Sequence, residues 1–299
     1  MKRIRYMLIM FLRVYFPVLY SKITYYFTYK LHCDLKNPRT FSEKLLWLSL
    51  HTYRNNMKVL MLCDKYLVRE YVATNVGPEI LNKLYGTYES DSYIDFNQLP
   101  HKFVFKISQG CTTNLLCPNK DNLTEQEFKK KISPWRKQYL YDRLMAQIGG
   151  IPVSKLKKWY ICEKYLDQKG HSSLTDYKIY CFNGKPLAIL VINERFGNQN
   201  AIFMSPKWEI LGKPIRNYHL PTNLPGRPPS LQHMLKIASK LSQGFPFVRV
   251  DLYDIQGQVV FGEMTFFPHG CIGMAEIKIN GESMGDLLDI SAEMKKFKG

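Results

Sequence analysis

The chain has 299 residues, 45% hydrophobic and 22% charged, so it can bury a sizeable core and is neither disordered nor of low complexity. Lys and Arg total 42 against 25 Asp and Glu, which gives a formal net charge of +17. This excess indicates anionic partners: phospholipid head groups, nucleotides, nucleic acids or acidic sugars. The seven cysteines show neither a C-x-x-C pair nor zinc-ligand spacing, which predicts free thiols in a reducing compartment.

The first thirty residues differ in composition from the rest of the chain. They contain six Lys or Arg, nine aromatic residues and no Asp or Glu. The apolar run 6–12 is broken by Arg13, and Pro17 follows, so it falls short of the ~18 apolar residues of a membrane span. A basic, aromatic, amphipathic segment is typical of anionic membrane surfaces. The alternative is an N-terminal helix packed on the domain with a basic outer face.

The first half of the chain predicts mainly helices. Thr40 begins one helix, and apolar residues at steps of three and four predict another over 57–76. A short strand is expected over 103–107, followed by a charged helix over 123–148. The Gly-Gly-Ile-Pro sequence at 149–152 breaks that helix, and we expect a lobe boundary near it.

The second half predicts antiparallel hairpins. Strands over 176–182 and 185–193 flank an Asn-Gly pair, which suits a type I′ turn. A helix is expected over 230–243, with Ser230 as its N-cap, and a second hairpin over 247–267 turns around Gly257. This order of elements predicts a mixed α+β fold.

The second hairpin carries the residues of greatest chemical interest. A turn centred on Gly257 sets Asp251 opposite Glu263, and Arg249 opposite Thr265, on one face of the hairpin. Two carboxylates this close repel each other unless a proton or a cation intervenes. Mg²⁺ takes such oxygen ligands and keeps positions open for phosphates. The pattern leaves two interpretations open: a magnesium site, or a structural salt-bridge network of Arg249, Asp251 and Glu263.

Other cations also have two interpretations each, as contacts to a ligand or as ordinary surface side chains. Lys106 ends the strand over 103–107 beside a small polar loop, where its ammonium group could reach a phosphate. Lys178 lies in the first hairpin, where the expected register sets it opposite Ile189; it either snorkels or serves an anionic ligand. Residues 163–166 follow an apolar strand at an expected hinge.

Six segments, in order, carry a resemblance to a known family. The segments are 38–44 (PRTFSEK), 64–71 (DKYLVREY), 99–106 (LPHKFVFK), 176–184 (DYKIYCFNG), 245–253 (FPFVRVDLY) and 262–270 (GEMTFFPHG). Through them the chain resembles, over residues 34–285, the TupA-like ATP-grasp family of bacterial surface-polysaccharide gene clusters.

The resemblance implies an ATP-grasp fold, in which two α+β lobes clasp ATP. We expect an N-terminal basic, aromatic helical segment over 1–56, the N-terminal lobe over 57–158 and the C-terminal lobe over 159–299. It also implies ATP and Mg²⁺ as cofactors.

The resemblance further implies a role for each matching residue. Arg249 and Lys106 would be catalytic, with Arg249 stabilising the charge on the transferred phosphoryl group. Asp251, Glu263 and Thr265 would hold Mg²⁺, Thr265 standing where many ATP-grasp enzymes have an Asn ligand. Residues implied to contact ATP are Lys65, Lys106, Ser108, Gly110, Glu163, Lys164, Tyr165, Leu166 and Lys178.

The activity implied is that of a carboxylate–amine ligase, which activates a carboxylate as an acyl phosphate and releases ADP and phosphate. In a polysaccharide setting the acid would be a uronic acid, on a saccharide that a lipid diphosphate can carry, and the nucleophile an amino acid or amine. We expect a cytoplasmic enzyme in peripheral contact with the inner face of an anionic membrane, and no nucleic-acid partner.

Three alternatives remain open from the sequence. The first is a glycosyltransferase, with a nucleotide-sugar pocket in place of the ATP site, and the second an ATP-grasp sugar phosphotransferase. The third is a non-enzymatic basic module, which the lack of RNP, KH and zinc-finger patterns disfavours.

Overall fold

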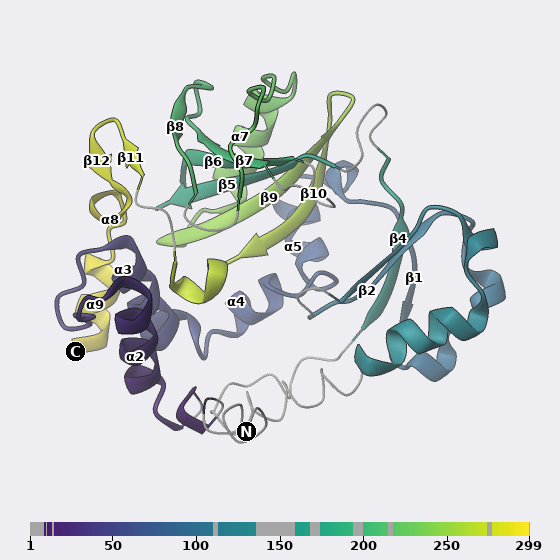
Figure 1. Ribbon diagram of the computed structural model, residues 1–299, viewed down its shortest axis with the longest axis horizontal. Helices are drawn as coiled ribbons and strands as arrows, with labels where there is room; N and C mark the ends of the chain where they lie inside the picture. The colour runs from purple at the N-terminus through teal and green to yellow at the C-terminus, as the bar shows by residue number, and fades with distance from the viewer. Residues whose placement is uncertain are drawn as a thin grey trace. The chain divides into compact units, whose positions relative to one another are not determined.

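The computed structural model describes residues 9, 11–13, 15–109, 113–135, 159–167, 174–193, 200–214, 218–273 and 277–298. The chain divides into two compact units, residues 1–56 together with 167–299 (the larger unit) and residues 57–166 (the smaller unit). Figure 1 shows the elements of each. The strand over 160–164 pairs within the smaller unit. The parts expected from the sequence, a helical segment over 1–56 and lobes over 57–158 and 159–299, stay a prediction.

The smaller unit is built on a four-stranded antiparallel sheet in the order β1-β4-β2-β3. Phe103, Phe105 and Ile107 alternate along β2 and are fully buried, packing with Phe128 of the helix over 125–135 and with Tyr160. The intervening Val104 and Lys106 lie on the other, half-buried face. The strands are β1 (Leu84–Tyr88), β2 (Phe103–Ile107, as predicted), β3 (Asn114–Cys117) and β4 (Tyr160–Lys164).

The single helix expected over 57–76 is wrong, because the structure has two helices there, α4 (Met57–Leu62) and α5 (Val68–Asn75). The break follows from Asp64, whose carboxylate accepts hydrogen bonds from the backbone N–H groups of Tyr66 and Leu67. A side chain that bonds its own backbone in this way offers an alternative to the helical hydrogen bonds.

The larger unit contains a six-stranded antiparallel sheet in the order β10-β9-β5-β6-β7-β8. Helix α7 (Leu231–Leu241) packs against β5, β6 and β9. Both predicted hairpins are confirmed, and Asn183 and Gly184 have the positive φ values, 48° and 80°, that a type I′ turn requires. The strands are β5 (Asp176–Phe182), β6 (Lys185–Asn193), β7 (Asn200–Met204), β8 (Ile210–Gly212), β9 (Phe247–Ile255) and β10 (Gln258–Thr265).

The remaining helices of the larger unit lie near its two chain ends. Thr40 and Glu43 form the capping box of α3, which confirms the predicted helix start, and α3 contacts α8. Ser230 precedes α7 as expected, but its hydroxyl bonds Asp254 instead of the helix backbone. The elements are α2 (Pro17–Tyr29), α3 (Phe41–Leu48), α8 (Met284–Leu287), α9 (Ser291–Lys298), β11 (Lys278–Ile279) and β12 (Glu282–Ser283).

Short helical turns connect these elements. The π-helix η1 (Ser49–Tyr53) continues α3. The 3₁₀ turns are η2 (Pro78–Ile80), η3 (Asp91–Tyr93), η4 (Phe96–Gln98), η5 (Lys120–Asn122) and η7 (Pro268–Cys271). Within the described residues, none of the helices is both long and apolar enough to cross a membrane.

Six of the seven cysteines lie in the described residues, and all six are free thiols, as predicted. Most are buried, and burial raises the pKa of Cys162 to about 12. A thiol with so high a pKa stays protonated at neutral pH and is a poor nucleophile or metal ligand.

Two β-bulges set the registers of the hairpins. A bulge between Tyr180 and Cys181 sets Lys178 opposite Leu190, so the predicted pairing with Ile189 is wrong by one residue. In the second hairpin a bulge at Gly262 brings Glu263 opposite Asp251, and Thr265 opposite Arg249, which confirms both predicted pairs.

Gly262 gives a direct test of this register. A Cβ atom there would lie 2.9 Å from the Asp251 carbonyl oxygen and 3.1 Å from the Tyr253 ring, so Gly262→Ala must shift the bulged strand. We expect it to lower the free energy of unfolding by about 1–3 kcal/mol, measured by urea denaturation. Gly226→Ala is the matched control, because its Cβ would meet nothing within 4 Å. Equal stability of the two variants would contradict a sterically set register.

Candidate functional site

The polar centre of the larger unit is a buried network of ion pairs around Asp251. Arg249 donates a hydrogen bond to each carboxylate oxygen of Asp251, from Nε to Oδ1 at 2.7 Å and from Nη2 to Oδ2 at 2.7 Å. Lys178 Nζ lies 2.6 Å from the same Oδ2 and 4.0 Å from Asp176 Oδ1. These residues share one face of the sheet because Lys178 pairs with Asp251 across β5 and β9. The structure therefore brings together three of the predicted site residues and adds Asp176.

The charges in this network are mutually stabilising. Burial opposes ionisation of Asp251, yet the positive charges of Arg249 and Lys178 outweigh it and hold the pKa of that carboxyl below its usual value. Arg249 in turn has its pKa raised: burial favours the neutral form, but the Asp251 carboxylate outweighs that effect. On the neighbouring strand, burial raises the pKa of Tyr180 to about 12. Both members of the Arg249–Asp251 pair are thus charged at neutral pH.

Glu263 and Thr265 complete the network on β10. Arg249 Nη2 donates to Glu263 Oε1 at 3.1 Å and to Thr265 Oγ1 at 3.1 Å, and the Thr265 hydroxyl donates to Glu263 Oε1 at 3.0 Å. The cation between the two facing carboxylates is therefore Arg249. In this geometry the salt-bridge network, one of the two interpretations open from the sequence, is formed.

The donor set also fits a divalent ion of the magnesium kind. Asp251 and Glu263 supply carboxylate oxygens, Thr265 a hydroxyl, and the Glu263 side chain is 39% exposed and so can be reached by a ligand. Among the described residues no cluster of three or more His, Cys, Asp or Glu side chains could hold a metal. A metal here would accordingly use two carboxylates and complete its coordination with other oxygens.

The smaller unit holds a second group of predicted residues. Lys106 Nζ lies 2.7 Å from Glu163 Oε2, and Arg69 Nη1 lies 3.4 Å from Glu163 Oε1. Glu163 pairs with Val104 across β4 and β2, so its side chain shares a face with Lys106 two residues further on. The nearly buried Glu163 is thereby shared between two cations.

Lys65 and Ser108 are joined through the break between α4 and α5. The Lys65 N–H donates to the Ser108 carbonyl oxygen at 2.9 Å, and the Ser108 hydroxyl donates to Asp64 Oδ2 at 2.8 Å. Ser108 and Asp64 are completely buried. Ser108 thus fixes the loop after β2 against Lys65, and its own side chain faces the protein interior.

The expected hinge follows the end of β4. Lys164 is exposed, and its backbone bonds the segment before β1: its N–H donates to Lys83, and its carbonyl oxygen accepts from Asn82. Tyr165 and Leu166 follow outside the strand, both half-buried. Gly110, the remaining predicted contact, lies outside the described residues.

Sequence reasoning missed three residues that organise these sites. Asp64 and Arg69 lie in the segment 64–71 that carries part of the family resemblance. No neighbouring residue in the sequence indicates that Asp64 contacts Ser108 and that Arg69 contacts Glu163. Asp176 had a usable signal, since it lies two residues before Lys178 and so on the same strand face.

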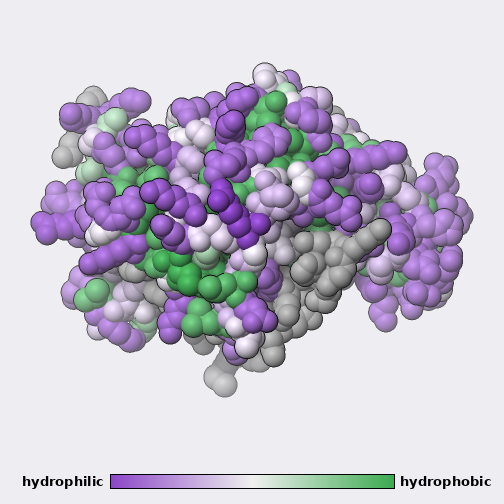
Figure 2. Space-filling model, turned by 90° about the horizontal axis from the view of Figure 1, so that it is seen from above, coloured by the Kyte–Doolittle hydropathy of each residue, from purple (hydrophilic) through white to green (hydrophobic). Residues whose placement is uncertain are grey.

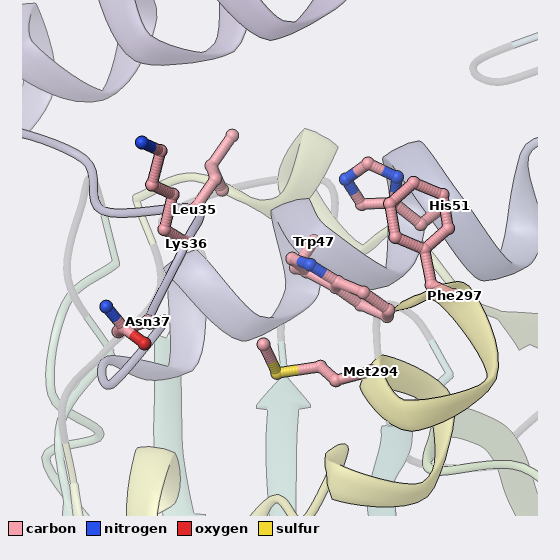
Figure 3. A pocket seen from close by; sticks show the side chains of 7 residues that line it. All are labelled: Leu35, Lys36, Asn37, Trp47, His51, Met294 and Phe297. Atoms are coloured by element: carbon pink, nitrogen blue, oxygen red, sulfur yellow. The ribbon is translucent and has the colours of Figure 1, made fainter. Parts of the chain in front are cut away.

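A hollow of about 370 Å³ lies elsewhere in the larger unit (Figure 3). The rings of Trp47, His51 and Phe297 gather on one side of it, with the segment 35–37 across from them. None of the predicted site residues lines it. The hollow is therefore separate from the ion-pair network.

Comparison with known proteins points to one family. The family model TupA-like ATPgrasp matches residues 43–288. Among curated protein sequences, none matches the chain significantly.

Solved structures with a similar arrangement include a D-alanine–D-alanine ligase from Bacillus anthracis. Its ATP complex is 14% identical with a TM-score of 0.41, over 71% of this chain and 57% of that one; a second structure of this enzyme gives 14% and 0.47, over 86% and 76%. The ATP-grasp ligase PsnB, complexed with a precursor variant, Mg and ADP, is 10% identical with a TM-score of 0.43, over 82% and 64%. The chain thus spans little more than half of the first of these proteins.

Asp251 and Glu263 should differ in their effect on stability. Asp251→Asn leaves the buried Arg249 without a full counter-charge, so we expect a loss of about 3 kcal/mol or more in the free energy of unfolding. Glu263→Gln should cost under ~1 kcal/mol, because Glu263 is half-exposed and Gln keeps an acceptor for Arg249. Urea denaturation at pH 7 measures both.

The same comparison has a pH dependence. The pKa of Asp251 is lower in the folded state than in the unfolded state. Its contribution to the free energy of unfolding is therefore fully present above the unfolded pKa of ~3.9 and is lost as the pH falls through the folded pKa. The difference in the free energy of unfolding between wild type and Asp251→Asn, the stability gap, should narrow below about pH 4. A gap that stays constant down to pH 2 would show that Asp251 is not paired as described.

Proposed function

Because the chain belongs to the TupA-like ATP-grasp family, we propose that it is a carboxylate–amine ligase of surface-polysaccharide biosynthesis that uses ATP and Mg²⁺. Membership confirms the predicted ATP-grasp fold. ATP as cofactor and an ATP-dependent ligase as the enzyme class are part of the proposal. The observation that carries the finer proposal is the hairpin in which Arg249 lies between two facing carboxylates.

The reaction would proceed in two transfers. A substrate carboxylate oxygen attacks the γ-phosphorus of ATP, the bond to the bridging oxygen breaks, and ADP leaves. An amine nitrogen then attacks the acyl carbon, phosphate leaves, and the nitrogen loses a proton to give the amide. Arg249 would stabilise negative charge on the transferred phosphoryl group, since a rigid, buried guanidinium needs no reorganisation to do so.

Asp251 and Glu263, with Thr265, would hold Mg²⁺, which offsets phosphate charge when bound. Lys178 would then exchange its bond to Asp251 for one to a phosphate oxygen. Its ammonium group is already nearly buried beside the carboxylate, so the exchange needs only a rotation of a flexible side chain.

Lys65 and Lys106 would contact the ATP phosphates, while residues 163–166 would lie against adenine and ribose. The support is the position of Lys106, held at the end of β2 by Glu163, and of Lys65, held by the loop after β2. Ser108 would act by positioning this loop, and Gly110 would belong to it.

The substrate class is proposed from charge. The +17 net charge favours an acidic saccharide, whose uronic-acid carboxylate would be the acid, with an amino acid or amine as nucleophile. A saccharide carried on a lipid diphosphate would be met at the cytoplasmic face of the membrane, where we propose that the enzyme works in peripheral contact. The polymer would be of the capsule, O-antigen or teichuronic type.

Nucleotide binding separates the ligase from a glycosyltransferase. ATP with Mg²⁺ should raise the melting temperature of the protein, and UDP-sugars should not. A nucleotide concentration of 100 times Kd corresponds to a gain of ~2.7 kcal/mol in the free energy of unfolding. Glu263→Gln should lose most of this gain, whereas the exposed Glu282→Gln should keep it. Stabilisation by UDP-sugars alone would overturn the proposal, and an unchanged gain in Glu263→Gln would remove Glu263 from the metal site.

Product analysis separates the ligase from a phosphotransferase. ADP and phosphate should form only when an acid acceptor is present, and hydroxylamine should trap the acyl phosphate as a hydroxamate when the amine is omitted. Lys106→Met should slow this step ~10²–10³-fold, because phosphate charge is left unbalanced. The exposed Lys102→Met is the matched control and should stay within twofold. A stable phosphosugar without hydroxamate, across a panel of uronic acids, would contradict the ligase.

A further inference from the structure

Helix α2 has an unusual surface. Hydrophilic side chains cover most of the face drawn in Figure 2, with apolar ones in small patches among them. On α2, large apolar side chains are exposed along the helix, and Phe27 reaches 69%. Exposed apolar residues also precede and follow it; the set is Ile9, Phe11, Tyr15, Phe16, Val18, Leu19, Ile23, Tyr26, Phe27 and Leu31. Exposed apolar residues gathered along one helix in this way mark an interaction site.

The opposite side of α2 is fixed to the larger unit. Tyr25 is buried, and its hydroxyl lies 3.2 Å from Thr40 Oγ1. The centre of the Tyr29 ring lies 4.7 Å from that of Tyr25, with the rings tilted by 50°. The Tyr29 hydroxyl bonds Ser42 Oγ at 2.8 Å and accepts from the Gly273 N–H at 2.6 Å. The helix is therefore part of the folded unit, and its orientation is set.

Most of the exposed apolar residues of α2 lie on one face, whereas Val18, seven residues before the buried Tyr25, lies on the other side. Leu19, Ile23 and Phe27 recur every four residues, and their spacing from Tyr25 sets them on the side away from the unit. We call this side, with Phe16 and Tyr26, the outer face. The expected basic outer face is thus mainly apolar, with cations at its edges.

The charge around the outer face has a single sign. No Asp or Glu occurs before Asp34, while Arg13, Lys22 and Lys30 are exposed. Lys30 Nζ lies 5.5 Å from the centre of the Phe27 ring. Aromatic and aliphatic side chains bordered by cations are what a helix lying in the interface of an anionic bilayer presents.

We propose that the outer face of α2 is a preformed docking surface for an anionic lipid bilayer. The helix would lie in the membrane plane, with Phe16, Leu19, Ile23 and Phe27 among the head groups and acyl chains. The proposal names the surface through which the proposed ligase meets its membrane, and rests on that function only for the identity of the substrate presented there.

A second copy of the chain fits this face less well than a bilayer. A symmetric dimer would bring Lys22, Lys30 and Arg13 of both copies together, without an acidic group in the segment to offset them. Anionic head groups supply that missing charge, and acyl chains cover the apolar residues.

Docking would also orient the catalytic strand. Gly273, which donates to Tyr29, lies eight residues after Thr265 at the end of β10. Because α2 and β10 belong to the same unit, a helix held in the membrane plane gives the Arg249–Asp251–Glu263 network a defined orientation towards the bilayer.

Flotation of the full-length protein with vesicles tests the surface. With 30% phosphatidylglycerol in phosphatidylcholine we expect binding that weakens at high salt, and at least tenfold weaker partitioning into phosphatidylcholine alone. Phe27→Asp should weaken partitioning into the anionic vesicles at least tenfold. The neighbouring Thr28→Asp adds the same charge at an exposed position off the outer face, and should change it less than threefold.

The possible outcomes distinguish a bilayer from a second copy of the chain as the partner of the outer face, and they distinguish membrane docking from ligase activity. Absent binding, or equal loss in Phe27→Asp and Thr28→Asp, would overturn the docking surface. So would a lipid-free dimer, seen by light scattering, that Phe27→Asp dissociates while vesicle binding persists. Hydroxamate formation with a soluble uronic acid is measured in the same variants. It should be unchanged in Phe27→Asp, so a failed ligase and a failed membrane surface give different results.

Discussion

The buried ion pair between Arg249 and Asp251 is the constraint on which the larger unit depends. A charge taken out of water must find a partner with good geometry, and here two hydrogen bonds of 2.7 Å supply it. That requirement sets the register of β9 against β5 and β10, because Lys178 and Glu263 must reach the same pair. The bulge at Gly262 follows from it, since without the extra residue Asp251 would face Gly262.

The smaller unit repeats this arrangement with other residues. Glu163 is nearly buried and is balanced by Lys106 and Arg69, as Asp251 is balanced by Arg249 and Lys178. In both units a buried carboxylate holds a cation that we propose contacts phosphate, Lys106 in the smaller unit and Lys178 in the larger. These cations keep their positions without a ligand, so phosphate oxygens would meet ordered side chains and little rotamer entropy would be lost on binding.

The elements that could be predicted are those fixed by short-range chemistry. Asn183-Gly184 admits the positive φ angles of its turn, and Thr40 with Glu43 caps α3, so these boundaries agree with the sequence. The pairs Asp251–Glu263 and Arg249–Thr265 were predicted from strand alternation and a turn centred on Gly257. The strands in fact pair from Ile255 and Gln258, and the bulge at Gly262 restores the predicted pairs. The break at Asp64 was missed although its cause is local: the N–H groups of Tyr66 and Leu67 donate to Asp64 Oδ1. The bond from Ser108, 44 residues away, to Asp64 Oδ2 has no local signal. The bulge after Tyr180 has no sequence signal that we can identify.

The positive charge of the chain is distributed between two roles. The site cations Lys106, Arg69, Lys178 and Arg249 are matched by Glu163, Asp251 and Glu263, so they contribute little to the net excess. Six of the excess seventeen charges lie in the first thirty residues, where no acid balances them. An ATP site alone therefore does not account for the composition. The proposed membrane-facing helix would account for that part, since an anionic, partly apolar surface complements cations that lie beside exposed aromatic rings.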